Sequence, residues 1–312
     1  MRLPAHFVAC LGLACAATAA DAQQLRTTHV AGNVFMISGA GGNVTVSTGD
    51  NGVLLVDAGS AEMSESLLRA VREISDGPIR YVINTSILPE HIGGNAVLRA
   101  AGETFTGGNA TVVGGVGEGA AVVGYESLLL RLAGMPQYPT ETAPTETFFV
   151  PKLDLYFNDE PVEIIHQPQA VDDTNTIVHF RRSDVISAGD VFRIDSYPYF
   201  DIENGGSING IIAALNALVD LAIADTLQEG GTLIIPGHGR ICDEGDLVRY
   251  RDMITIIRDR IRAGIDRGLS LRQIKAAEPT LAYDSRYGAT RSDWTTERFI
   301  EAIYASLVDD AS

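Results

Sequence analysis

Short hydrophobic runs separated by turn-forming residues open the chain after its first thirty positions. Residues 34–37, 43–47 and 53–56 are rich in β-branched side chains, and the glycine-rich segments 39–42 and 49–52 lie between them. Short β-rich runs bounded by glycine, asparagine and aspartate are typical of strands joined by tight turns. We therefore predict an antiparallel meander over this region.

Longer periodic segments alternate with further strand-like runs along the rest of the chain. Leu67, Leu68, Val71 and Ile74 recur at helical spacing, which predicts a helix capped by Ser60 and extending to residue 75. Further helices are predicted at 95–101, 125–133, 208–224, 247–267 and 294–307, and further strands at 81–84, 153–157, 162–166, 176–180, 185–187 and 232–235. Two groups of strands, each followed by helices, predict an α/β four-layer αββα sandwich.

Composition restricts the partners of this chain. Its 312 residues are 46% hydrophobic and 20% charged, as in an ordinary folded protein, and its formal net charge is −17. Because an acidic surface repels phosphate backbones and anionic lipid, nucleic acid is not expected as a partner. A small-molecule substrate or ligand is the expected partner.

The N-terminus has the composition of an export signal. Arg2 precedes an apolar stretch over residues 7–20, and Ala20 and Ala22 are small residues of the kind that precede a cleavage site. We predict a signal peptide over 1–22, an uncleaved anchor being the alternative, and a periplasmic or secreted protein with one domain over 23–312 that includes the C-terminal helices. No other stretch is apolar enough to cross a membrane. Cleavage leaves Cys242 as the one cysteine, which is expected to be a small buried hydrophobe.

The segment at 84–95 carries the most chemical information. It reads Asn-Thr-Ser-Ile-Leu-Pro-Glu-His-Ile-Gly-Gly-Asn between a predicted strand and a predicted helix. It resembles the loop Asn-Thr-His-x-His-x-Asp-His-x-Gly-Gly-Asn of the metallo-β-lactamase superfamily. Segments 53–59, 187–192 (with Gly189-Asp190) and 234–239 (with His238) resemble other motifs of that family in the same order. The resemblance covers roughly residues 30–239 and implies the family's fold.

Three positions depart from the family pattern. Ser86 and Leu88 stand at the first two histidine positions of the loop, and a third histidine position aligns with Val171. The resemblance implies that these three histidines would together bind one metal ion. Leucine and valine have no lone pair to offer, so that metal site is expected to be empty.

A second group of ligand positions is retained. The resemblance implies that Glu90, which replaces an aspartate, His91, Asp190 and His238 would bind one divalent metal ion. Two imidazoles and two carboxylates suit Zn²⁺, with Fe²⁺ or Mn²⁺ as alternatives. Glu90 and Asp190 are the candidate catalytic carboxylates. The alternative is that the four residues are relics that bind no metal.

Several other residues have a structural interpretation beside a functional one. Asp57 is expected to brace the motif loop, and His29, His166 and His179 are expected to make structural contacts. Asp172 and Asp173 are either metal ligands or solvated loop carboxylates, and Tyr197 and Tyr199 either line the site or pack in the core.

Two functions remain open. One is an exported hydrolase with at most one metal ion, acting on an ester, lactam, thioester or related bond. The other is an inactive relative that binds a ligand or partner.

Overall fold

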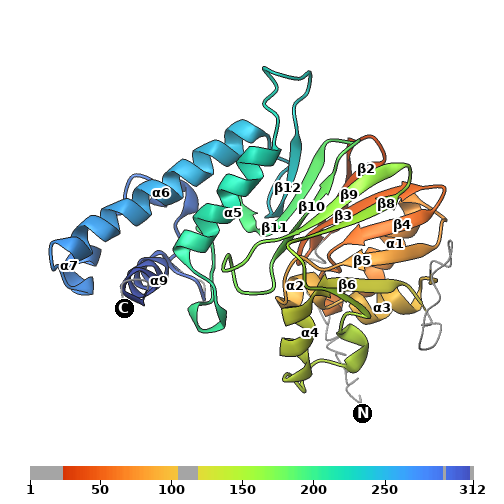
Figure 1. The fold of residues 1–312 in the computed structure, drawn as a ribbon, viewed down its shortest axis with the longest axis horizontal. Helices are drawn as coiled ribbons and strands as arrows, with labels where there is room; N and C mark the ends of the chain where they lie inside the picture. Colours follow the sequence, from red (N-terminus) through yellow and green to blue (C-terminus); the bar gives the residue numbers. More distant parts are fainter. Residues whose placement is uncertain (1–23, 105–118, 291–292, 310–312) are drawn as a thin grey trace, which may run out of the picture.

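The computed structural model describes residues 24–104, 119–290 and 293–309, and two β-sheets form its centre (Figure 1). The first sheet has the strand order β1-β2-β3-β4-β5-β6-β7. Its first four strands are antiparallel, and β4 to β7 are parallel. Its strands are β1 (Arg26–Ala31), β2 (Val34–Ala40), β3 (Gly42–Gly49), β4 (Gly52–Val56), β5 (Ile79–Ile83), β6 (Ala121–Tyr125) and β7 (Glu146–Phe148).

The second sheet has the order β12-β11-β10-β9-β8. Strands β8 to β11 pair antiparallel, whereas β11 and β12 pair parallel. Its strands are β8 (Lys152–Phe157), β9 (Glu160–His166), β10 (Thr176–Phe180), β11 (Val185–Arg193) and β12 (Leu233–His238). A parallel pair requires a crossover connection, which here contains the helix α5 (Ile208–Leu221).

Helices cover the outer face of each sheet. Helices α1 (Ser64–Ile74) and α3 (Asn95–Ala100) pack on the first sheet through Leu67, Val71 and Leu98. Helices α5, α6 (Glu244–Asp266) and α9 (Thr296–Asp309) share a large apolar core with the second sheet. A third core, which includes Leu54 and Phe180, lies between the sheets. The predicted four-layer αββα sandwich is therefore confirmed (Figure 1).

The sequence missed several short elements and some boundaries. Strands β1, β6 and β7 were not predicted, nor were the short helices α2 (Pro89–Ile92), α7 (Leu271–Ala276) and α8 (Asp284–Tyr287). Ser60 makes no side-chain cap; a 3-10 turn over Ala61–Met63 precedes α1 instead. Predicted helix 125–133 is α4 (Glu126–Ala133). Strands β11 and β12 extend further than predicted, so that Asp190 lies within β11 and His238 ends β12.

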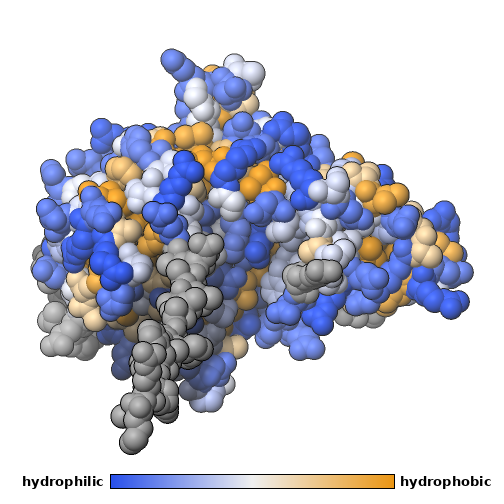
Figure 2. Space-filling model, turned by 180° about the vertical axis from the view of Figure 1, so that it is seen from behind, coloured by the Kyte–Doolittle hydropathy of each residue, from blue (hydrophilic) through white to orange (hydrophobic). Residues whose placement is uncertain are grey.

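The surface is mainly hydrophilic on the face shown in Figure 2, with smaller hydrophobic areas between the polar residues. Within the described part of the chain, no helix has the length and apolar character needed to cross a membrane. The predicted signal peptide at 1–22 lies outside the described residues.

Candidate metal centre

Four side chains that are far apart in the sequence converge at one edge of the sandwich. One ligand atom from each of Glu90, His91, Asp190 and His238 lies within 4.8 Å of the others. Asp190 is central: its Oδ2 lies 3.5 Å from His91 Nε2, and its Oδ1 lies 3.5 Å from His238 Nε2. Glu90 Oε1 lies 3.9 Å from His238 Nε2. Among the described residues, this is the one group of three or more such side chains close enough to hold an ion.

Strand ends and one short helix position the four side chains. Glu90 and His91 lie on α2, which follows β5 of the first sheet. Asp190 and His238 come from β11 and β12, which the parallel pairing holds side by side. The side-chain amide of Asn43 on β3 donates to the carbonyl oxygens of Pro236 and Gly239, at 2.9 and 3.0 Å. This contact joins the loop that carries His238 to the first sheet.

Asp57 fixes the orientation of His91. The Nδ1 atom of His91 lies 2.8 Å from Asp57 Oδ2, and both side chains are fully buried or nearly so. Asp57 also accepts from the backbone N–H and the hydroxyl of Thr85, so it braces the motif loop as expected. Because Asp57 takes the Nδ1 side of the ring, Nε2 is the nitrogen that faces the cluster, the arrangement that metal-binding histidines commonly have.

The buried charges of the cluster shift its pKa values in different directions. Burial opposes the charge on His91, but the carboxylates of Asp57 and Asp190 outweigh it and raise the pKa of His91 well above its usual value. Burial would raise the pKa of Asp190, yet His91, Arg193 and His238 hold it well below the usual range. Burial lowers the pKa of His238, which is therefore neutral at pH 7. A metal ion would compete with a proton for His91 only.

The bonding capacity of the cluster is unmet. His91 Nε2, Asp190 Oδ1 and His238 Nε2 are buried and have no hydrogen-bond partner. Buried polar atoms are nearly always paired, because an unpaired one costs about 1–3 kcal/mol. Three such atoms facing each other fit a divalent cation with nitrogen and oxygen ligands. Glu90 and His238 are 27% and 22% exposed, so the site is open to solvent on their side.

The three replaced positions form a different environment. Ser86 and Val171 are fully buried, and Leu88 packs against the apolar core that contains Val171. The Ser86 hydroxyl accepts from the backbone N–H of Leu88. The loop that carries Val171 is tied to the motif loop by a hydrogen bond from Ile87 N to Thr174 Oγ1. No side chain at these three positions belongs to the ligand cluster.

The other candidates have structural contacts. His166 lies 3.1 Å from the carbonyl oxygen of Asp173 and stacks on Tyr125. Asp172 is buried rather than solvated, bonds to Thr174 and pairs with Arg131. The expectation of a solvated loop carboxylate is therefore wrong for Asp172, whereas the side chain of Asp173 is 49% exposed. Neither aspartate belongs to the cluster.

Two tyrosines and two histidines complete the set of earlier candidates. Tyr197 is buried and donates to Asp284, so it packs in the core, and Tyr199 stacks edge-on against Trp294. His29 contacts the carbonyl of Gly32, and His179 lies 3.3 Å from Glu163.

Cys242 is buried, as expected, and burial with nearby negative charge raises the pKa of its thiol to about 12.

Sequence reasoning missed two residues beside the cluster. The guanidinium of Arg193 donates to Asp190 Oδ2 at 3.2 Å. Its position three residues after Asp190 was the available signal. Tyr138 lies near Glu90, and burial together with the charge of that carboxylate raises the pKa of Tyr138. No signal in the sequence places Tyr138 there.

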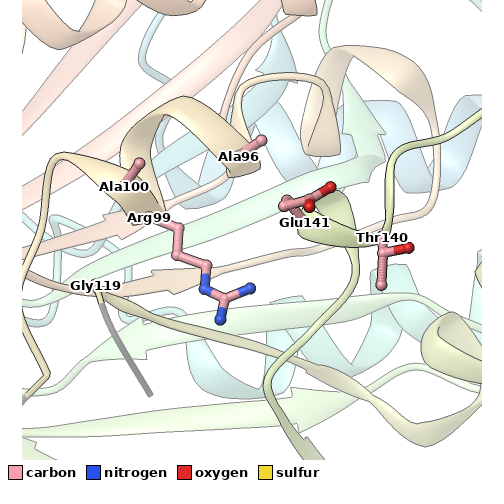
Figure 3. Close-up of a pocket in the computed structure, with 6 residues that line it drawn as sticks. All are labelled: Ala96, Arg99, Ala100, Gly119, Thr140 and Glu141. Carbon is pink, nitrogen blue, oxygen red and sulfur yellow. The ribbon is translucent and has the colours of Figure 1, made fainter. Parts of the chain in front are cut away.

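A pocket of about 420 Å³ lies away from the cluster, between α3 and the turn at Thr140–Thr142 (Figure 3). The side chains of Arg99 and Glu141 reach into it. None of the four clustered residues lines this pocket, and Gly119 at its rim adjoins the undescribed segment 105–118.

The fold and the ordered motifs define a class of protein. The family model of the metallo-beta-lactamase superfamily matches residues 37–238, and the chain belongs to this family. Each clustered residue lies within the matched range. No curated protein sequence is significantly similar to the chain.

Solved structures share this fold at low sequence identity. A metallo-beta-lactamase from Pontibacter korlensis has a TM-score of 0.58 and 15% identity, over 74% of this chain and 99% of its own. The DIM-1 metallo-beta-lactamase has a TM-score of 0.55 and 17% identity, over 74% and 97%. The stereoselective inverting sec-alkylsulfatase Pisa1 from Pseudomonas sp. has a TM-score of 0.65 and 13% identity, over 90% of this chain and 50% of its own. These likenesses establish the fold alone.

Proposed function

We propose that the chain is a hydrolase that uses one divalent metal ion, Zn²⁺ in the first place, with Fe²⁺ and Mn²⁺ as alternatives. The substrate would carry an ester, lactam, thioester or related bond. One observation carries the proposal: the buried atoms His91 Nε2, His238 Nε2 and Asp190 Oδ1 face one another without partners. A protein that had lost metal binding altogether would gain stability by filling this space with paired or apolar groups.

The residues of the cluster have distinct parts in the proposed chemistry. A bound divalent ion would acidify a water molecule and polarise the bond to be cleaved. His91 would bind the ion through Nε2 while Asp57 holds its ring. Asp190 remains an anion because its pKa is far below neutrality. Glu90 is partly exposed, so its carboxylate can also accept a proton at the solvent side of the site.

A binding protein without catalysis is the second candidate. The replacement of three potential ligands by Ser86, Leu88 and Val171 supports it, because these positions supply no ligand in the cluster. In that case the site would hold a ligand or partner through the same exposed edge, and turnover would be absent.

Metal analysis of purified protein tests the proposal directly. We expect one equivalent of metal per chain by elemental analysis, and its loss in the variant His238→Ala, in which one of two imidazoles is missing. His166→Ala is the matched control, since His166 contacts the carbonyl of Asp173 and lies outside the cluster. Any hydrolysis of a panel of ester, thioester and lactam substrates should disappear with chelator and with His238→Ala.

The results separate the candidates. Two equivalents of metal, or hydrolysis that survives both chelator and His238→Ala, would contradict the single-metal hydrolase. Absence of both metal and turnover would favour the binding protein.

We further propose that the protein is exported to the periplasm or secreted after removal of residues 1–22. The basic start, apolar stretch and small residues before Gln23 support this. N-terminal sequencing of the protein recovered from cell fractions should give Gln23 as the first residue. An intact N-terminus in the cytoplasmic fraction would contradict export.

A further inference from the structure

Arg193 is a cation in direct contact with the ligand cluster. It ends β11, and its backbone pairs in register with His238 on β12. Its Nη1 donates to Asp190 Oδ2 at 3.2 Å, while its Nε is buried without a partner. The side chain is 21% exposed, so this contact is largely shielded from water.

Asp190 divides its two oxygens between different neighbours. Oδ2 takes the guanidinium hydrogen bond, whereas Oδ1 is buried, has no hydrogen-bond partner and faces His238 Nε2. The carboxylate therefore offers one oxygen to a cation that belongs to the chain and keeps the other free. A second positive ion at Oδ2 would have to displace the guanidinium.

The formal charges around the site agree with this division. Asp57, Glu90 and Asp190 contribute three negative charges within the connected set of contacts. A divalent ion alone would leave an excess negative charge in a buried environment, which is costly. The guanidinium of Arg193 supplies the third positive charge, and it cannot be lost by deprotonation.

We propose that Arg193 is a built-in cation that shares Asp190 with the metal ion, one carboxylate oxygen each. This inference rests on the proposed metal site. It has two consequences: Arg193 limits the cluster to a single divalent ion, and it weakens the binding of that ion by like-charge repulsion. A purely structural Arg193, which only orients Asp190, would have the opposite effect on affinity, because its loss would disorder a ligand.

The sign of the change in metal affinity therefore tests the inference. Zn²⁺ is titrated calorimetrically into metal-free full-length protein, as wild type, Arg193→Gln and Arg193→Lys. Glutamine keeps a hydrogen-bond donor without the charge, and lysine keeps the charge. We expect Arg193→Gln to bind Zn²⁺ more tightly by on the order of tenfold or more, because a univalent and a divalent cation that share one carboxylate repel each other, and the repulsion is stronger where water is largely excluded. Arg193→Lys should stay within about threefold of wild type, because it keeps that repulsion.

Two further variants keep the test decisive. Arg193→Met is a second neutral variant in case Arg193→Gln does not fold, which circular dichroism checks. Arg258→Met removes an arginine of similar exposure, 23% against 21%, that lies on α6 outside the cluster. It should leave Zn²⁺ affinity unchanged. The melting temperature of the metal-free protein should fall in both neutral variants, and the rise in melting temperature on adding Zn²⁺ should be larger than in wild type.

Each outcome bears on the inference separately from the proposed function. If wild type binds one ion and both neutral variants bind it equally or more weakly, Arg193 is structural and the inference fails, while the metal site stands. If only the neutral variants bind, the inference holds and the native metal site does not. If neither wild type nor the variants bind Zn²⁺, both fail.

Discussion

The ligand cluster and the three replaced positions lie in neighbouring loops but differ in how their polar groups are satisfied. In the cluster, three buried ligand atoms have no hydrogen-bond partner. At the replaced positions, the hydroxyl of Ser86 is bonded, and Leu88 and Val171 join an apolar core. Both environments are buried. Buried atoms without partners also occur elsewhere, as at Asn175 Nδ2, but in the cluster they belong to ligand side chains that converge within 4.8 Å. This convergence, rather than polarity or burial, distinguishes the candidate site from the replaced positions.

Each region also has its own bracing aspartate. Asp57 holds His91 and Thr85 beside the cluster, whereas Asp172, in the loop that carries Val171, holds Thr174 of that loop and Arg131 of α4. The first brace leaves Nε2 of His91 directed at the site. The second pairs with groups of the chain: Asp172 Oδ1 accepts from the N–H and the hydroxyl of Thr174, and Asp172 Oδ2 lies 3.2 Å from Arg131 Nη1.

Removal of a ligand should have the largest effect. We expect His91→Ala to weaken Zn²⁺ binding by more than ~100-fold, because loss of a supporting residue alone typically costs 10–100-fold. Titration calorimetry of the metal-free protein measures it. Leu88→Ala is the counterpart from the replaced positions and should change Zn²⁺ affinity by less than about twofold, since leucine offers no ligand atom. Equal losses in the two variants would break the distinction between the regions.

The brace beside the cluster should come next. Asp57→Asn keeps the shape of the side chain and suits the positive φ of 70° at this position, which asparagine tolerates. It removes the charge that orients His91, so we expect a loss of about 10–100-fold in Zn²⁺ affinity. An unchanged dissociation constant would show that Asp57 serves folding alone.

Truncation of Val171 should act on stability only. Val171 is completely buried in the core of the second sheet. We expect Val171→Ala to lower the free energy of unfolding by about 2 kcal/mol through lost burial and a residual cavity. Urea denaturation gives this value, and calorimetry should give a Zn²⁺ affinity equal to that of wild type. A change in Zn²⁺ affinity would instead place Val171 among the residues that shape the metal site.

The smallest effect should come from the ion pair between Arg240 and Asp246, which follow His238 in the sequence. Arg240 makes two hydrogen bonds to Asp246 on α6, which with Arg249 lower the pKa of Asp246 from 3.8 to about 2. A carboxyl group whose pKa is lower in the folded than in the unfolded state stabilises the fold at pH values above its unfolded-state pKa. This contribution is lost as the pH falls from about 4 to about 2. Asp246→Asn should thus cost about 1 kcal/mol at pH 7, since both arginines are largely exposed, and almost nothing near pH 2.

Denaturation of wild type and Asp246→Asn at pH 7, 4 and 2 checks this window. Asp172→Asn serves as a control of opposite sign. Burial raises the pKa of Asp172, so the stability that its carboxyl contributes is greatest below the ordinary pKa and falls as the pH rises. A cost of Asp246→Asn that is the same at all three pH values would contradict the role of its charge.

The sequence predicted the architecture well because the relevant signals are local. Hydrophobic periodicity and glycine-rich turns indicated most long elements, and four ordered motifs indicated which residues converge. Short elements escaped: β7 spans only Glu146–Phe148, and its pairing with β6 comes from the tertiary structure. The ends of β11 and β12 were also missed, because partner strands and not propensity extend them.

The electrostatics of the site could not be predicted from the sequence. Arg193 follows Asp190 by three positions, but only the bend in β11, marked by register shifts between Ser187 and Arg193, brings its guanidinium to the carboxylate. The unpaired state of three ligand atoms is likewise a property of the packed molecule. The roles of Glu90, His91, Asp190 and His238 in metal binding and catalysis stay predictions, although their convergence is visible.

The parallel pairing of β11 with β12 has a consequence for how the chain folds. The cluster draws on position 90, on α2 after β5 of the first sheet, and on positions 190 and 238, on β11 and β12 of the second sheet, which the crossover with α5 joins. Contacts between residues so distant in sequence carry a loop-closure cost and form slowly compared with local helices and hairpins. A nascent or refolding chain thus has secondary structure before it has a place for an ion. The rate of Zn²⁺ uptake during refolding would accordingly report the rate at which the two sheets dock.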